Sequence, residues 1–187
     1  ENLFDLLNKQ PNVPIDEHAK DLVINQGKIT FKQVQFSYRP DRTILHDLSF
    51  DVLPGQKVAV VGESGSGKST LVKLLFRFYD TTSGSIYIDG QDIRAVNQHS
   101  LRKAIGIVPQ DTVLFNDTIL ENIRYGRPEA SDQDVQQAID LAHLRSFITS
   151  LPDGEQTKVG ERGLKLSGGE KQRVAIARTI LKRPPIM

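Results

Sequence analysis

The sequence predicts an α/β domain, and three observations carry that prediction. A glycine-rich loop at 62–69 stands between a short apolar, β-branched stretch (57–61) and an apolar helical pattern. Two stretches of alternating apolar and polar residues precede the loop, as in half-buried strands. Beyond residue 110 the pattern becomes mostly helical. An α/β core with antiparallel and helical additions follows from this order.

Turn residues delimit the individual elements. Pro54-Gly55 leads into the strand before the glycine loop, Asp89-Gly90 closes a hairpin, and Pro184-Pro185 ends the last helix. The predicted strands lie at 29–36, 44–52, 57–61, 85–88 and 105–108. The predicted helices lie at 68–78, 98–103, 118–125, 132–142, 143–151 and 168–182. Leu3, Phe4, Leu6 and Leu7 add an amphipathic pattern at helical spacing, followed by a polar, proline-broken linker.

Composition limits the functional classes. With 187 residues, 38% of them hydrophobic and 25% charged, the chain fits one globular domain with a core of its own. A net charge of +1 gives no reason to expect nucleic acid or an anionic membrane as an electrostatic partner. The absence of cysteine excludes disulfides, thiolate metal sites and cysteine nucleophiles. No apolar run in this sequence approaches the ~20 residues of a membrane span.

The loop at 62–69 matches the phosphate-binding pattern G-x-x-x-x-G-K-[ST]. Its residues are Gly62, Glu63, Ser64, Gly65, Ser66, Gly67, Lys68 and Ser69, and Thr70 follows in the helix. Glycines let successive backbone N–H groups face a phosphate, and the helix start adds partial positive charge. Lys68 can then reach the β- and γ-phosphates, and the Ser69 hydroxyl can ligate Mg²⁺. The alternative is an ordinary glycine-rich turn, but the flanking pattern predicts nucleoside triphosphate binding.

A second glycine-rich helix start follows at 166–173. Ser167 stands at the N-cap position, and Gly168 and Gly169 leave the first backbone N–H groups bare, as in an anion site. Alone, the segment reads equally as a capped helix start. With the phosphate loop in the same chain, the interpretation as an anion site gains weight.

These segments together resemble the nucleotide-binding domain of an ABC transporter, over nearly the whole chain. Tyr38 stands where the family has its adenine-stacking aromatic, and Gln110 stands in the glutamine loop. The signature motif matches 166–172, and the cross-contact loop typical of exporters matches 158–163. The sequences at 75–80, 110–119 and 160–165 are similar to those of half-transporters of mitochondrial iron–sulfur export and heavy-metal tolerance, and of their bacterial relatives.

The resemblance implies a P-loop NTPase (RecA-like) core with an antiparallel β subdomain and an α-helical signature-motif subdomain at about 111–167. It implies a nucleotide-binding domain over 27–187 and, over 1–26, a linker from a preceding transmembrane domain. In the family's core sheet, two later strands lie between 57–61 and 105–108. Those strands, the Walker B aspartate, the catalytic glutamate and the switch histidine are expected beyond Met187, in a longer polypeptide.

The resemblance also implies roles for the candidate residues, with ATP and Mg²⁺ as cofactors. Tyr38 would stack on adenine; the alternative is a strand-end tyrosine packed on the core. Gln110 would reach Mg²⁺ or the attacking water, so Gln110 and Lys68 are the catalytic candidates and Ser69 and Gln110 the metal candidates; the alternative for Gln110 is a solvated loop side chain. The residues 167–169 would cap the γ-phosphate held by a second copy of the domain.

The implied function is the ATPase motor of a membrane exporter, with cargo such as glutathione-type or metal- and sulfur-related conjugates. The implied partners are a second nucleotide-binding domain, as in a homodimer, and a transmembrane domain, whose coupling helices would face 111–125; the alternative for 111–125 is ordinary helix packing. The domain would lie on the cytoplasmic or matrix side of an inner membrane. The basic run at 171–183 is interpreted as a solvated helix face. A soluble ABC-type ATPase and a fragment that binds ATP without turnover remain the alternatives.

Overall fold

The computed structural model describes residues 13, 14, 16 and 18–187, so the amphipathic pattern at 3–7 lies outside the described residues. The chain divides into two compact units, and each is described by itself. The first unit reaches Ile105 and includes Ile186, and the second comprises 106–185 with Met187. Among the described residues, none of the helices combines the length and apolar character of a membrane span.

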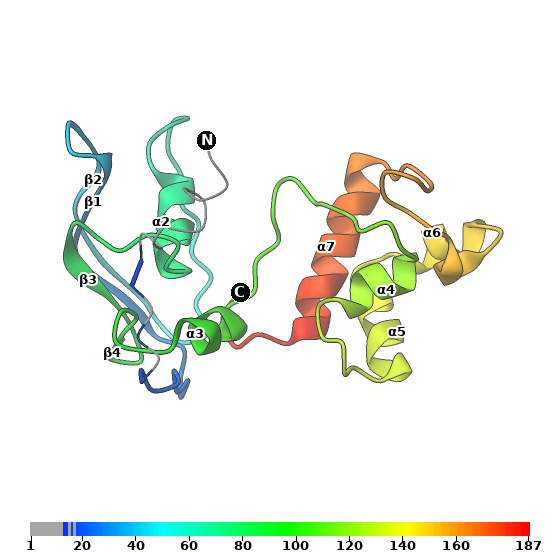
Figure 1. Cartoon of the computed structure of the whole chain (residues 1–187), viewed down its shortest axis with the longest axis horizontal. Coiled ribbons are helices and arrows are strands. Elements are labelled where there is room, and N and C mark those ends of the chain that lie inside the picture. Colours follow the sequence, from blue (N-terminus) through cyan, green and yellow to red (C-terminus); the bar gives the residue numbers. More distant parts are fainter. Residues whose placement is uncertain (1–12, 15, 17) are drawn as a thin grey trace, which may run out of the picture. The chain divides into compact units, whose positions relative to one another are not determined.

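The first unit contains a four-stranded antiparallel sheet in the order β2–β1–β3–β4 (Figure 1). The strands are β1 (Ile29–Arg39), β2 (Arg42–Val52), β3 (Ser83–Ile88) and β4 (Gln91–Asp92). The predicted strands at 29–36, 44–52 and 85–88 are thereby confirmed. The alternating pattern buries Phe31, Val34 and Phe36, and Phe31 stacks on Phe50 with ring centroids 4.5 Å apart.

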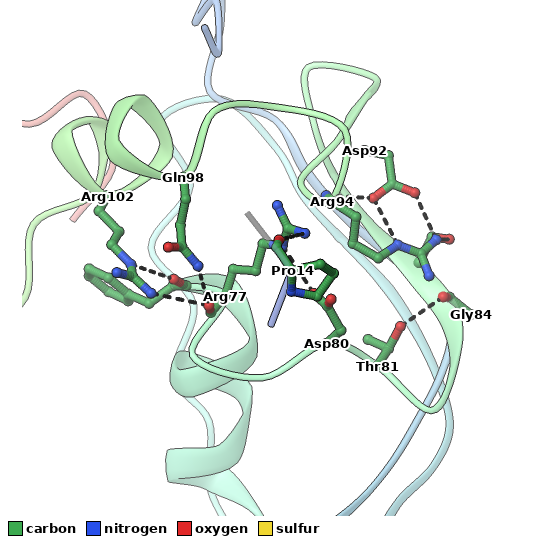
Figure 2. Close-up of polar contacts among 11 residues, drawn as sticks. Pro14, Arg77, Asp80, Thr81, Gly84, Asp92, Arg94, Gln98 and Arg102 are labelled. Atoms are coloured by element: carbon green, nitrogen blue, oxygen red, sulfur yellow. Dashed lines mark hydrogen bonds and ion pairs between the residues drawn. The ribbon is translucent and has the colours of Figure 1, made fainter. Parts of the chain in front are cut away.

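The helix after the glycine loop, α2 (Lys68–Leu75), is shorter than the predicted 68–78. Arg77 adopts a left-handed backbone conformation with φ of 51°, which an α-helix cannot contain. Its side chain is buried, donates from Nε to Asp80 (3.0 Å) and reaches the carbonyl of Pro14 (3.2 Å), as Figure 2 shows. These contacts hold the turn that ends α2.

The backbone of the same turn is fixed by α3 (Gln98–Ala104). The carbonyl oxygen of Arg77 accepts hydrogen bonds from Gln98 and from Arg102 (Figure 2). Asn97 caps α3, which confirms the predicted helix at 98–103.

Two predicted strands, 57–61 and 105–108, are wrong as strands. The first has no regular structure, and Val58, Val60 and Val61 are exposed. In the second, only Ile105 forms a bridge, with Ile186. An apolar sequence favours an extended chain, but a strand also needs a hydrogen-bonded neighbour. Within the described residues, no such neighbour pairs with 57–61.

The later part of the predicted linker is hydrogen-bonded to the first unit. The carbonyl of Lys20 accepts from the N–H of Asn97, and the N–H of Leu22 donates to Ser100. Farther along, the carboxylate of Asp89 accepts from the backbone N–H groups of all four residues 25–28, at 2.7–3.0 Å. The chain between residues 20 and 28 is therefore held on the sheet unit.

The second unit is helical, and its helices confirm the predicted ones. They are α4 (Ile119–Arg124), α5 (Asp132–Leu141), α6 (Arg145–Ser150) and α7 (Gly168–Lys182), with a 3₁₀ turn η1 (Gly154–Gln156). Thr118 and Ser131 cap α4 and α5. The predicted helix at 143–151 begins later because His143 has φ of 55°. Apolar side chains of α4, α5 and α7, among them Ile123, Val135 and Val174, form the core.

Candidate functional site

The glycine loop ends on a helix that has no side-chain cap. Gly65 and Gly67 have φ of 83° and 93°, the left-handed region that glycine occupies without strain. Gly67 is the N-cap of α2, and no side chain accepts from the helix start. Within the described residues, the N–H groups of Gly65, Gly67 and Lys68 are not among the donors of backbone hydrogen bonds. Such a cluster of free N–H groups at a helix start is suited to bind an anion.

Lys68 adds a cation to this cluster. Its Nζ donates to the carbonyls of Gly62 (2.7 Å) and Glu63 (2.6 Å) and lies 3.4 Å from Ser66 Oγ. The ammonium is thus held over the loop by the loop's own oxygens. The next side chain, Ser69, is exposed, so its hydroxyl is available as a hard oxygen ligand for a cation such as Mg²⁺.

Tyr38 is tied to the helix that carries the loop. Its hydroxyl lies 3.2 Å from the Thr70 hydroxyl, and Thr70 is buried two residues after Lys68. The ring meets Tyr79 edge-on at 5.1 Å and has the ammonium of Lys73 over it at 5.5 Å. The residue is still 43% exposed, so ring area remains for a base to stack on.

A hollow of about 410 Å³ lies beside this tyrosine. Its lining comes from β1, the following turn, the start of β2 and the segment before β3: Gln35, Ser37, Tyr38, Arg39, Pro40, Thr43 and Thr82. The first unit therefore brings together the phosphate loop, the exposed Ser69 hydroxyl, Thr70 and the candidate stacking ring.

The second glycine-rich helix start differs in that the protein caps it. Ser167 Oγ accepts from the N–H of Glu170 (3.3 Å), and the Glu170 carboxylate accepts from the N–H of Ser167 (2.7 Å). This capping box confirms Ser167 as the predicted N-cap. Ser167, Gly168 and Gly169 are all exposed, and a Cβ built at Gly168 meets nothing within 4 Å. The helix start is complete by itself and also open to an external group.

Gln110 is exposed in a stretch without regular structure. It belongs to the second unit, whereas Lys68 and Ser69 belong to the first. Its joint action with those residues therefore stays a prediction. So does the contact of 167–169 with a nucleotide.

Sequence reasoning missed three polar residues of the second unit: Asn122 and Thr179, which are buried, and Arg178, which is half-buried. The basic run at 171–183 was interpreted as a solvated helix face, and for Arg178 this is wrong. Its guanidinium is half-buried on the inner side of α7 and donates to Asn122 and to the carbonyl of Val113. Burial lowers the pKa of Arg178. The available signal was helical spacing, because Arg178 lies four residues after the buried Val174 and three before the buried Leu181 on α7.

A comparison with known families decides the broader assignment. The family model described as "ABC transporter" matches residues 45–187, more than half of the chain. This chain belongs to the ABC transporter family. The resemblance noted from the phosphate loop and the signature motif is thereby confirmed.

The relatives of this ABC transporter chain narrow its branch. It is 59% identical to ATP-binding cassette sub-family B member 6 of Rattus norvegicus over 187 residues, all of this chain and 22% of that protein. It is 56% identical to the mitochondrial iron-sulfur clusters transporter ATM1 of Debaryomyces hansenii, covering 27% of that protein. It is 57% identical to heavy metal tolerance factor 1 of Caenorhabditis elegans, covering 23% of it. The chain thus spans about a quarter of the length of these curated relatives.

A solved structure agrees in fold. A bacterial Atm1-family ABC exporter with ATP bound matches 97% of this chain and 32% of its own, at a TM-score of 0.92 and 58% identity. The predicted α/β, P-loop NTPase fold is therefore confirmed, and membership in the family implies that the domain binds ATP.

Proposed function

We propose that this chain is the ATP-binding and ATP-hydrolysing motor domain of a membrane exporter, which works as a pair of domains closed around two ATP molecules. The observation that carries the proposal is the pair of glycine-rich helix starts. The start of α2 is uncapped and carries Lys68, whereas the start of α7 is capped by Ser167 and stays exposed. The first is suited to bind a triphosphate, and the second is suited to cover a triphosphate that is bound to another copy.

Binding follows from the first unit. The loop at 62–67 and Lys68 hold the β- and γ-phosphates, and Thr70 stands at the start of the same helix. Tyr38 stacks on the base, a contact worth roughly 1–3 kcal/mol and indifferent to the base's donor pattern. Ser69, together with Gln110, would hold Mg²⁺, which would offset phosphate charge. The hydroxyl, the ammonium and the free N–H groups form a donor set that fits this ligand.

Closing the site around ATP requires a second copy of the domain. Ser167, Gly168 and Gly169 of one copy cap the γ-phosphate held by Lys68 of the other, so both copies share each ATP. Gln110 orients the attacking water. Loss of the γ-phosphate removes the shared anion, and the two copies separate.

The membrane domain is proposed to dock on the second unit. A groove of about 480 Å³ is lined by Phe115, Asp117, Glu121, Asn122, Arg124, Tyr125 and Pro128. Tyr125 and Phe115 lie there with exposed fractions of 64% and 46% and ring centroids 4.6 Å apart. Exposed aromatic side chains around a hollow are typical of a docking surface. Apart from Pro128, the lining of this groove belongs to the segment 111–125 predicted to face the coupling helices.

The cargo and the location are inferred from the relatives. Their names refer to iron–sulfur clusters and heavy-metal tolerance, and we therefore propose glutathione-type or metal- and sulfur-related conjugates as cargo. The domain would lie on the cytoplasmic or matrix side of an inner membrane, with an identical copy as partner and no nucleic acid.

Crosslinking between two differently marked copies tests the shared ATP. These 187 residues contain no cysteine, so thiols introduced by Ser64→Cys and Ser167→Cys are unique within them. In the complete polypeptide, with any other cysteine replaced, copies carrying one substitution each are mixed and treated with a short bis-maleimide. We expect ATP to produce a crosslink between the two copies, and Lys68→Ala to abolish it.

The matched control replaces Ser167→Cys by Ser150→Cys, another exposed serine of the second unit. This pair should give no ATP-dependent crosslink. If Ser64 and Ser167 of different copies fail to crosslink with ATP while the nucleotide is bound, the two-copy site is refuted. Phosphate release measured on the same preparation separates turnover from binding alone.

A further inference from the structure

We infer that Arg178, together with Asn122, is a positioning residue that joins the Gln110 loop and the docking groove to α7. A displacement of the groove is thereby transmitted along α7 to Ser167. The inference rests on the proposed function and names residues that couple its two surfaces.

Arg178 binds only neutral oxygens among the contacts found for it. Its Nε and one terminal nitrogen donate to the backbone and side-chain oxygens of Asn122, both at 2.6 Å. The other terminal nitrogen donates to the carbonyl of Val113 at 2.8 Å, and the guanidinium lies 5.5 Å from the centre of the Phe115 ring. A half-buried cation keeps such bonds because losing one leaves charge without compensation.

Asn122 extends this hold to residues 115–118, directly before α4. It is 1% exposed, and its Oδ1 also accepts from the N–H of Phe115 at 2.9 Å. Its Nδ2 donates to the carbonyls of Phe115 (3.1 Å) and Thr118 (2.9 Å). One amide therefore fixes a loop that has no regular structure of its own, and its acceptor is shared with Arg178.

A second bond from α7 holds the other side of Gln110. Thr179 is buried, and its hydroxyl lies 2.9 Å from the carbonyl oxygen of Ile107 and 3.0 Å from that of Ala175, so the two carbonyls share its one proton. Since Arg178 holds Val113, adjacent residues of α7 hold Ile107 and Val113, three residues before and three after Gln110. The position of the Gln110 loop is thus set by α7.

α7 is continuous between these bonds and the signature motif. It runs from Gly168 to Lys182, and Arg178 lies eleven residues beyond Ser167, about 16 Å at 1.5 Å per residue. Phe115 and Asn122 line the docking groove and contact Arg178. An occupant that displaces the groove wall must therefore either move α7, with Ser167 at its start, or break the bonds of Arg178.

Steady-state kinetics of the complete polypeptide in phosphatidylcholine liposomes tests this. With Arg178→Gln, we expect kcat for ATP to fall about tenfold or more while KM changes by less than about twofold, because the phosphate loop, Lys68 and Tyr38 lie in the other unit. Arg178→Lys keeps the positive charge but has a single donor group. Its kcat should therefore lie between those of the native protein and of Arg178→Gln. The matched control, Arg145→Gln, removes a guanidinium whose hydrogen bonds within the described part of the chain go to Asp140 and Gln136 of α5, and it should change neither constant.

A double-mutant cycle separates coupling from a purely structural role. Glu121→Lys reverses a charge at the groove, and Glu121 pairs only with Arg124 among the ion pairs found. It should lower kcat about threefold or more in the native background and by less than about 1.5-fold with Arg178→Gln. Amide exchange at 113–118 and at 168–170 should rise together in Arg178→Gln.

Three results would overturn the inference: equal effects of Glu121→Lys in both backgrounds, no effect of Glu121→Lys at all, or a parallel change of kcat and KM in Arg178→Gln. The same holds if exchange rises across the second unit without preference for these segments. Each of these leaves the ATP-dependent crosslink between Ser64 and Ser167 standing. Loss of that crosslink in the otherwise native protein would instead refute the proposed function.

Discussion

The two glycine-rich helix starts are similar in sequence but differ in capping, since α2 has no side-chain cap and α7 has one. At α2 the N-cap is Gly67, no side chain accepts from the helix start, and a lysine stands at the first helical position. At α7 the N-cap is Ser167, and Glu170 completes a reciprocal capping box. The first leaves backbone donors for a ligand, whereas the second satisfies its first donors internally and exposes what remains.

A third cluster of N–H groups clarifies this difference. The four N–H groups of residues 25–28 converge on the carboxylate of Asp89, an anion that the chain itself supplies. Clustered backbone donors thus occur twice in the first unit, once with their own anion and once without. A glycine-rich turn by itself does not indicate a nucleotide site, but a cluster without an internal acceptor does.

Removing the lysine should produce the largest effect. Lys68→Ala deletes the cation that the loop holds at 2.6–2.7 Å from two of its carbonyls. A charged hydrogen bond to phosphate contributes roughly 1.5–3 kcal/mol, so ATP affinity should fall about tenfold to a hundredfold. Equilibrium binding of labelled ATP measures this. Lys171→Ala, at the other helix start, should leave that affinity unchanged, and an equal loss there would contradict the comparison.

Adding one methyl group should lower stability at the start of α2, whereas at the start of α7 it should affect only the contact with a phosphate. At Gly67, with φ of 93°, a Cβ would meet Leu45 Cδ2 at 2.9 Å, so Gly67→Ala should lower stability by about 1–3 kcal/mol and disturb the loop. At Gly168 nothing lies within 4 Å, so Gly168→Ala should fold normally but block the lid. Thermal unfolding and the ATP-dependent crosslink separate the two variants. A Gly168→Ala protein that closes normally would show that no phosphate approaches there.

The elements that sequence reasoning placed correctly are those with local causes. α7 begins and ends where its cap and Pro184-Pro185 predict, because both signals lie within a few residues of the helix. The stretch 57–61 was predicted as a strand, but pairing depends on residues far along the chain. Arg178 was misread for the same reason, since its acceptors Val113 and Asn122 lie 65 and 56 residues away.

Substitutions of the serine separate the cap from the lid. Ser167→Ala removes the cap bond to Glu170 and should cost about 1 kcal/mol of stability. Ser167→Asp keeps an N-cap acceptor, so stability should be retained, but its negative charge would repel a γ-phosphate. We therefore expect Ser167→Asp to have the same melting temperature as the native protein and yet to lose ATP hydrolysis. Normal hydrolysis in Ser167→Asp would argue against any phosphate at this helix start.

The smallest effect is expected where the chain supplies its own anion. Desolvation alone would raise the pKa of Asp89, but the four N–H donors outweigh it and lower the pKa to about 2. Because this is below the usual 3.8, the carboxylate stabilises the fold above about pH 4, and that contribution is lost as pH falls from about 4 to 2. Asp89→Asn should cost roughly 1 kcal/mol at pH 7, since nearby solvent screens the charge.

Amide exchange at 25–28, corrected for intrinsic rates, gives a local measurement of this contribution. The native protein should protect these four N–H groups more than Asp89→Asn at pH 7, and the difference should shrink strongly as pH falls towards 2. Asp117→Asn is the matched control, since the Asp117 carboxylate accepts only from the adjacent N–H of Thr118 among the contacts found. A difference that persists undiminished at pH 2 would mean that shape, and not the charge of an internal anion, organises these donors. The contrast with the phosphate loop would then lose its physical basis, because it depends on clustered N–H groups responding to negative charge.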